Sequence, residues 1–267
     1  MNYKELGDTG VQIPEIGLGT WNYRGWLKPL QKGIELGATL IDTAEGYHTE
    51  DIVGQAIRGM RDKVFIATKV SGRHLAYRDV LKSAEESLYK LGISCIDLYQ
   101  IHWPNPVYPI KQTMKAMREL ADNGLIKFIG VSNFSLEELK EAQYYLNNYK
   151  IVSNQVLYNL NRREIEKDLM PYCEDNKITI IAYTPLDSGK LTKTGLLNNA
   201  ANEVLAQVAA DEGKTLSQVA LNWCNSRQCV VSIPKSDSVE RTVENCGGSG
   251  WRLKRENIER LDQAFRI

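Results

Sequence analysis

The sequence predicts a single (β/α)8 barrel, the TIM-barrel fold, over residues 1–267. Short β-branched runs alternate with amphipathic stretches whose apolar residues recur at helical spacing. Eight such repeats fit in about 250 residues, the usual length of a closed barrel of this type. The run 178–182 does not alternate polar with apolar residues, which is typical of parallel strands buried on both faces. No linker or charge block divides the chain.

Each repeat begins with a predicted strand. The eight strands are expected at 16–19, 39–42, 64–69, 96–102, 126–132, 152–155, 179–183 and 230–233. The helices are expected at 27–36, 50–60, 78–91, 110–123, 136–146 and 165–176, followed by a pair at 202–212 and 217–225 and another that starts near Ser238.

Two segments lie outside this count. Residues 3–6 and 11–13 flank the turn-rich segment Gly7-Asp8-Thr9-Gly10, which predicts a β-hairpin that plugs the bottom of the barrel. Residues 255–265 read as a last amphipathic helix. The competing doubly wound fold needs a glycine-rich first turn, and the segment from Gly17 to Asn22 lacks the third glycine.

Composition excludes several classes of function. The chain has 33 Lys and Arg against 33 Asp and Glu, so no polycationic surface for nucleic acid or anionic membranes is expected. Its five cysteines form no C-x-x-C pair and there are three histidines, which argues against a disulfide framework or a metal site. No signal peptide or membrane-spanning run is recognisable, so we expect a cytoplasmic protein.

Four polar residues follow or close successive predicted strands, where the chemistry of such barrels gathers. They are Asp42, Tyr47, Lys69 and His102. Singly, each could be a turn cap, a rim residue or a satisfied core group. Together they bring an acid, a phenol, a base and an imidazole to one end of the barrel, and Lys69 and His102 interrupt apolar runs where a buried polar group is costly.

These four groups suggest a proton donor. A tyrosine hydroxyl ordinarily titrates near pH 10 and is a poor acid at pH 7. A neighbouring Lys69 would stabilise the phenolate of Tyr47 and lower its pKa, while Asp42 would keep the lysine charged. His102 would offer a neutral N–H to a carbonyl oxygen.

These residues lie in segments that resemble the aldo-keto reductase family, and the resemblance extends along the whole chain. The similar segments are IDTAEGYHTE at 41–50, IATKV at 66–70, LYQIHWP at 98–104, GVSNF at 130–134, NQ at 154–155, AYTPL at 182–186 and IPKS at 233–236, all in the family's order. The resemblance implies an NADPH-dependent oxidoreductase that reduces aldehydes or ketones to alcohols by hydride transfer from nicotinamide C4, with Tyr47 as the proton donor.

The same resemblance assigns further residues. Asp42, Tyr47, Lys69 and His102 become the catalytic residues, and no metal is implied. The cofactor-binding residues it implies are Ser132, Asn133 and Gln155 for the carboxamide, Tyr183 stacked on the nicotinamide, Leu186 in the following loop, and Lys235, Ser236, Arg241, Glu244 and Asn245 around the adenosine phosphate. Two cations beside a helix N-terminus favour NADP over NAD. Asp187, where glycine is frequent, leaves the conformation of this loop open.

Trp21 and Trp103 are expected to line the substrate pocket, and the expected substrate is a small-molecule carbonyl compound. The chain ends two residues after the last predicted helix, so an open pocket with broad substrate use is expected, and the resemblance implies a monomer. Two other functions stay open from the sequence. One is an NADPH-binding regulatory barrel with little turnover, and the other is a Schiff-base aldolase that uses Lys69.

Overall fold

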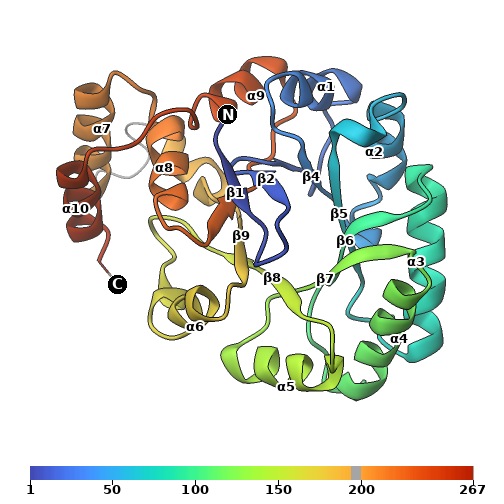
Figure 1. The fold of residues 1–267 in the computed structure, drawn as a ribbon. Helices are drawn as coiled ribbons and strands as arrows, with labels where there is room; N and C mark the ends of the chain where they lie inside the picture. The colour runs from blue at the N-terminus through green and yellow to red at the C-terminus, as the bar shows by residue number, and fades with distance from the viewer. Residues whose placement is uncertain (194–199, 267) are drawn as a thin grey trace.

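A computed structural model describes residues 1–193 and 200–266 and contains the expected barrel. Its eight parallel strands follow one another in chain order around the sheet (Figure 1). They are β3 (Leu18–Gly19), β4 (Leu40–Asp42), β5 (Phe65–Val70), β6 (Ile96–Ile101), β7 (Ile126–Ser132), β8 (Ile151–Leu157), β9 (Thr179–Tyr183) and β10 (Val230–Ser232). The predicted fold class is confirmed, and each strand overlaps its predicted range.

Backbone hydrogen bonds between the first and last strands close the sheet. Gly17 N–H donates to the Ser232 carbonyl at 2.8 Å, and Ser232 N–H donates to Glu15 at 2.9 Å. Gly19 N–H then donates to Pro234 at 3.1 Å. A Cβ at Gly19 would lie 2.7 Å from the Ile233 carbonyl oxygen, so only glycine allows this close approach. The seam therefore holds the segment after β10 beside the end of β3.

The helices form the outer layer. They are α1 (Leu27–Glu35), α2 (Glu50–Ala56), α3 (Tyr77–Leu91), α4 (Ile110–Asp122), α5 (Leu136–Leu146), α6 (Leu169–Asp175), α7 (Ala200–Glu212), α8 (Leu216–Asn225), α9 (Val239–Cys246) and α10 (Arg255–Ala264). Capping boxes begin two of them: Ser135 with Glu138 at α5, and Thr215 with Gln218 at α8. Among the described residues, no helix combines the length and apolarity needed to cross a membrane.

Two helices are shorter than expected, for local reasons. The segment predicted at 165–176 begins as a single 3-10 turn, η3 (Glu164–Glu166), and α6 starts only after Asp168, whose side chain accepts from Leu169 N–H at 2.6 Å. The segment predicted at 50–60 leaves the α-helix after Ala56, shortly before Gly59 adopts a φ of 77°.

The predicted hairpin closes the bottom of the barrel, at the amino-terminal ends of the strands. Its strands are β1 (Tyr3–Glu5) and β2 (Gln12–Pro14), and in Figure 1 they lie across the near end of the sheet. Leu6 and Ile13 are fully buried against the lowest layer of barrel side chains. Lys4 Nζ donates to the carbonyl oxygens of Asn225, Arg227 and Val230 at 2.6–2.7 Å, which fastens the plug to the end of α8.

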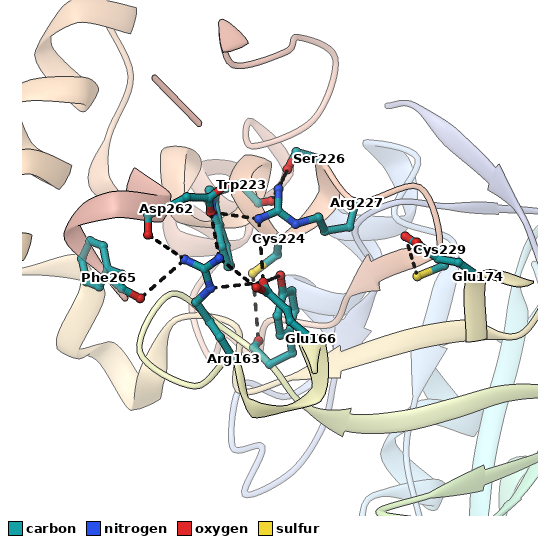
Figure 2. A network of polar contacts seen from close by, with 11 residues as sticks. Arg163, Glu166, Glu174, Trp223, Cys224, Ser226, Arg227, Cys229, Asp262 and Phe265 are labelled. Atoms are coloured by element: carbon teal, nitrogen blue, oxygen red, sulfur yellow. Dashed lines mark hydrogen bonds and ion pairs between the residues drawn. The ribbon is translucent and has the colours of Figure 1, made fainter. Parts of the chain in front are cut away.

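A network of charged groups holds α10 against the barrel wall. Figure 2 shows Arg163 and Arg227 beside Trp223, each guanidinium carbon 5.0 Å from the ring centroid. Arg163 binds Glu166 through two hydrogen bonds at 3.1 and 2.8 Å, and lies 3.1 Å from Asp262 of α10. Its Nη1 also donates to the Asp262 carbonyl at 3.2 Å. The last helix is therefore fixed to the loop after β8.

We expect Arg163→Ala to lower the free energy of unfolding by about 2–4 kcal/mol, because it removes the main partner of the partly buried Glu166 and the contacts of Arg163 with Asp262 of α10. Urea unfolding followed by circular dichroism measures this. Arg162→Ala is the matched control, since the Arg162 side chain is half exposed and should cost less than about 0.5 kcal/mol. Equal losses in the two variants would show that the network does not support the fold.

Candidate active site

The polar residues expected at the strand ends meet at the top of the barrel, opposite the hairpin. Asp42 is the last residue of β4, Lys69 is the penultimate residue of β5 and His102 directly follows β6. Tyr47 closes a short 3-10 helix, η1 (Glu45–Tyr47), in the loop after β4. Parallel pairing of β4, β5 and β6 brings these ends together, so one register places all four side chains.

Lys69 is the centre of this group. Its side chain is fully buried, and Nζ donates to Asp42 Oδ2 at 2.7 Å and to the Thr43 carbonyl at 2.8 Å. The same Nζ lies 3.4 Å from Tyr47 Oη. The second oxygen of Asp42 accepts from Gln155 Nε2 at 2.7 Å, so both carboxylate oxygens have a donor. All three protons of the ammonium group thus have an acceptor.

The charge state of Lys69 follows from these partners. Burial by itself lowers the pKa of Lys69, but Asp42 and Tyr47 together raise it by more, so the net pKa lies above its usual value. The amine is therefore protonated at neutral pH. A protonated amine is a hydrogen-bond donor and not a nucleophile.

The expected decrease in the pKa of Tyr47 is wrong for the chain without a cofactor. Burial raises the pKa of Tyr47 above its usual value, and the nearby Lys69 offsets this only in part, while the Asp42 charge adds to the increase. The sequence argument considered the cation and not the loss of water around the phenol. Tyr47 accordingly holds its proton firmly at neutral pH.

His102 lies on the other side of the phenol. Its Nε2 is 3.3 Å from Tyr47 Oη, and the two rings meet edge to face with centroids 5.2 Å apart. Burial, with a smaller contribution from Lys69, lowers the pKa of His102 to about 4. The imidazole is therefore neutral at physiological pH, so one ring nitrogen carries a proton and the other does not.

The residues expected around a nicotinamide carboxamide form a connected hydrogen-bond chain. Ser132 Oγ donates to the Gln155 carbonyl at 2.9 Å, and Asn133 Nδ2 donates to the His102 carbonyl at 3.0 Å. Tyr183 Oη donates to Asn133 Oδ1 at 3.0 Å. Asn133 has a φ of 62°, a left-handed conformation that asparagine tolerates better than most residues. These side chains are held in place before any ligand arrives.

A cavity of about 970 Å³ joins these groups to the expected phosphate residues. Its wall includes Trp21 and Trp103, which are 59% and 51% exposed, together with Asp42, Tyr47, His102 and Gln155. Of the other expected residues, it includes Ser132, Asn133, Tyr183, Leu186, Lys235, Arg241, Glu244 and Asn245. The structure therefore brings nearly all of the expected site residues to one cavity.

Among the expected site residues, the fully buried Lys69 does not line this cavity, and neither does Ser236. The side chain of Ser236 is buried, and Oγ donates to the Ser238 carbonyl at 2.9 Å while accepting from Ser238 N–H at 3.3 Å. Ser238 in turn caps α9 by accepting from Arg241 N–H. In this arrangement Ser236 shapes the start of the helix.

The loop after β9 contributes cavity residues that the sequence did not single out. Ser188, Gly189, Thr192 and Lys193 line the cavity on this side. The loop contains a 3-10 segment, η4 (Asp187–Thr192), interrupted by left-handed residues. Asp187 has a φ of 47°. A run of small and polar residues after a strand end was the available signal, but it did not reveal which of them face the cavity.

No group of three or more His, Cys, Asp or Glu residues able to hold a metal occurs in the part of the chain that the structure describes.

Comparison with known proteins decides the family. The model of the Aldo/keto reductase family matches residues 15–266. The chain belongs to the aldo/keto reductase family. The family and enzyme class inferred from the sequence motifs are thereby confirmed.

Similar proteins from bacteria cover the chain almost completely. The methylglyoxal reductase YeaE of Escherichia coli is 35% identical over 266 residues, which is 96% of this chain and 92% of that protein. A glyoxal reductase of Bacillus subtilis is 35% identical over 263 residues, 95% of this chain and 89% of that protein.

Solved structures of this aldo/keto reductase family superimpose closely. A thermostable aldo-keto reductase in complex with the inhibitor epalrestat has a TM-score of 0.92 at 39% identity, covering 99% of this chain and all of that one. An aldo/keto reductase from Klebsiella pneumoniae in complex with NADP and acetate has a TM-score of 0.88 at 33% identity, covering 98% of this chain and 95% of that one.

We expect the His102 imidazole to stay neutral down to about pH 5, since burial lowers its pKa to about 4. In the unfolded chain a histidine binds a proton near pH 6.5, so the unfolded state binds it first as the pH falls. The contribution of His102 to folding is thus complete above pH 6.5 and decreases from there toward pH 4. An NMR titration, with the signal identified by its loss in His102→Asn, measures this pKa. A value above 6 would refute the buried, neutral state.

Proposed function

We propose that this chain reduces the carbonyl group of small aldehydes and ketones to an alcohol, with Tyr47 as the proton donor. One observation carries the proposal. Tyr47 Oη lies 3.4 Å from a buried, ion-paired ammonium group and 3.3 Å from a neutral imidazole, at the wall of a cavity large enough for a cofactor and a substrate. Asp42, Lys69 and His102 are the groups that set the properties of this phenol.

The cofactor is NADP(H), and the side chains around the cavity fit it. Ser132, Asn133 and Gln155 offer hydroxyl and amide groups for a carboxamide, and the ring of Tyr183 lies beside them. At the other end, Lys235 in the segment after β10 and Arg241 in the first turn of α9 line the cavity. Cations and helix N–H groups together favour a phosphate there. Leu186, Glu244 and Asn245 complete the proposed cofactor contacts.

The bound cofactor supplies a hydride to the carbonyl carbon of the substrate. The carbonyl oxygen gains negative charge in this step and accepts the Oη proton of Tyr47, which completes the alcohol. Lys69 then stabilises the phenolate that Tyr47 becomes, and Asp42 keeps Lys69 charged and aimed at Oη. The neutral His102 ring can donate an Nε2–H hydrogen bond to the carbonyl oxygen of the substrate and so fix the position of that oxygen.

The chemistry of the pocket entrance favours small carbonyl compounds. Trp21 and Trp103 provide large apolar faces that remain about half exposed, so they can wall a pocket without closing it. The similar proteins from E. coli and B. subtilis are named for methylglyoxal and glyoxal, which are small dicarbonyl aldehydes. We therefore include such dicarbonyls among the substrates of this chain.

The two alternatives are less well supported. A Schiff-base aldolase needs a neutral lysine, but Lys69 is fully buried and engaged with Asp42, and its pKa is raised. No observation on the described residues supports a regulatory barrel without turnover. The extent of the domain over residues 1–267, a monomeric state, a cytoplasmic location and the absence of nucleic-acid binding stay predictions.

We expect Tyr47→Phe to lose carbonyl reduction by about 10²- to 10⁴-fold, because the variant removes only the proton that is transferred in the transition state. NADPH binding should be retained. The rate of NADPH consumption with methylglyoxal and the dissociation constant of NADPH are the two measurements. Tyr89→Phe, at a side chain that is 88% exposed, is the matched control. A Tyr47→Phe enzyme with more than about a tenth of the wild-type rate would exclude Tyr47 as the donor.

Arg241→Ala should weaken NADPH binding by roughly tenfold or more, since a charge-assisted contact with the 2'-phosphate contributes about 1.5–3 kcal/mol. NADH lacks that phosphate and should bind almost unchanged. Equilibrium titration of both cofactors distinguishes these outcomes, with Arg255→Ala in the exposed first turn of α10 as control. Equal weakening of NADPH and NADH would mean that Arg241 supports the fold or the phosphates that both cofactors share.

A further inference from the structure

The loop between β3 and α1 carries Trp21 and lies against the segment that follows β10. Both segments leave the barrel seam, where Gly19 and Lys235 form a parallel bridge. The loop returns to the seam a few residues later, since Arg24 N–H donates to Asp237 Oδ1 at 2.8 Å. A Cβ at Gly25 would lie 2.8 Å from both the Cα and the carbonyl oxygen of Asp237. The two backbones are therefore in direct contact at this point.

Inside the loop, other contacts keep its shape. Tyr23 is buried, its N–H donates to the Thr20 carbonyl at 3.1 Å, and its hydroxyl donates to the Trp26 carbonyl at 2.7 Å. The hydroxyl also lies 2.7 Å from the position of a Gly25 Cβ. A loop folded in this way moves as a unit, so the contact at Asp237 also sets where Trp21 stands.

Asp237 has a second partner. Its Oδ2 accepts a hydrogen bond from Lys235 Nζ, with both side chains about one-third to two-fifths exposed. Burial raises the pKa of Asp237, but the Arg24 N–H and Lys235 together lower it by more, so its carboxyl group is ionised at neutral pH. One carboxylate therefore touches both the loop that carries a wall of the substrate pocket and a cation at the phosphate end of the same cavity.

We propose that Asp237 is a positioning residue that fastens the Trp21 loop to the phosphate end of the cavity, and that it reduces the affinity for the cofactor phosphate by holding Lys235. The proposal rests on the proposed function, because it assumes that Lys235 meets a phosphate of NADPH. The two roles use different properties of the side chain. The loop needs only an oxygen that accepts a hydrogen bond, whereas the hold on Lys235 needs the negative charge.

These roles predict effects of opposite sign. Without the charge, Lys235 is free for the phosphate and no carboxylate repels it, so NADPH should bind more tightly. Without the acceptor oxygen, Arg24 N–H loses its partner, the loop loosens, and the substrate should bind less well. A residue that only supported the fold would weaken both ligands when removed.

Asp237→Asn and Asp237→Ala separate the roles, because asparagine keeps the acceptor oxygen and alanine does not. Both variants should bind NADPH about two- to fivefold more tightly, a range typical of exposed ion pairs, with a smaller change for NADH. Only Asp237→Ala should raise the KM for methylglyoxal, by about threefold or more, with kcat less affected. Glu240→Gln is the matched control for charge, since Glu240 is an exposed acid in the first turn of α9, shortly after Asp237, and does not line the cavity.

Hydrogen–deuterium exchange in the cofactor-free protein tests the loop contact without any activity. The peptide that covers residues 20–27 should exchange several-fold faster in Asp237→Ala than in the wild type, and Asp237→Asn should resemble the wild type. A wild type that neither binds NADPH nor reduces aldehydes would refute the proposed function and leave this exchange result intact. Unchanged exchange in Asp237→Ala, weaker NADPH binding in either variant, or equal tightening in Glu240→Gln would overturn the role of Asp237.

Discussion

The buried ion pair of Lys69 and Asp42 is the constraint on which the site depends. Taking two charges out of water costs several kcal/mol for each, and only good geometry with further hydrogen bonds compensates this cost. The chain meets that condition, because the Thr43 carbonyl, Gln155 and Tyr47 supply the remaining partners of the pair. The pair joins β4 to β5, and its partners come from β8 and the loop after β4, so the pair can exist only inside a closed barrel with the observed register.

The same burial fixes the chemistry on each side of the pair. Partial burial reduces the contact of Tyr47 with water, which raises its pKa, and that of His102, which lowers its pKa to about 4. Both groups are thereby neutral at physiological pH, and Lys69 supplies the positive charge that lowers the pKa of the phenol. A proton leaving Tyr47 is favoured when negative charge appears on a bound oxygen, because Lys69 is already in place for the phenolate. The site is thus organised for a charge that develops during the reaction.

Much of this could be predicted from the sequence, since the information was local. β-Branched runs gave the strands, helical spacing gave the helices, and polar residues that interrupt apolar strand ends pointed to Asp42, Lys69 and His102. Other features depend on contacts between segments far apart in the chain. The net direction of the Tyr47 pKa depends on packing around the ring, and the inward turn of Ser236 depends on the cap of α9. Nothing in the sequence pairs Arg24 with Asp237 or Arg163 with α10.

The central claim is that Lys69 makes Tyr47 a better acid than its buried position alone would allow. NMR titration of ¹³Cζ-labelled tyrosine, with the Tyr47 signal identified by its loss in Tyr47→Phe, measures the phenol directly in the wild type and in Lys69→Met. The account predicts that the pKa of Tyr47 rises further in Lys69→Met, because burial and the Asp42 charge remain while the cation is gone. A pKa of Tyr47 that stays the same or falls in Lys69→Met would contradict it.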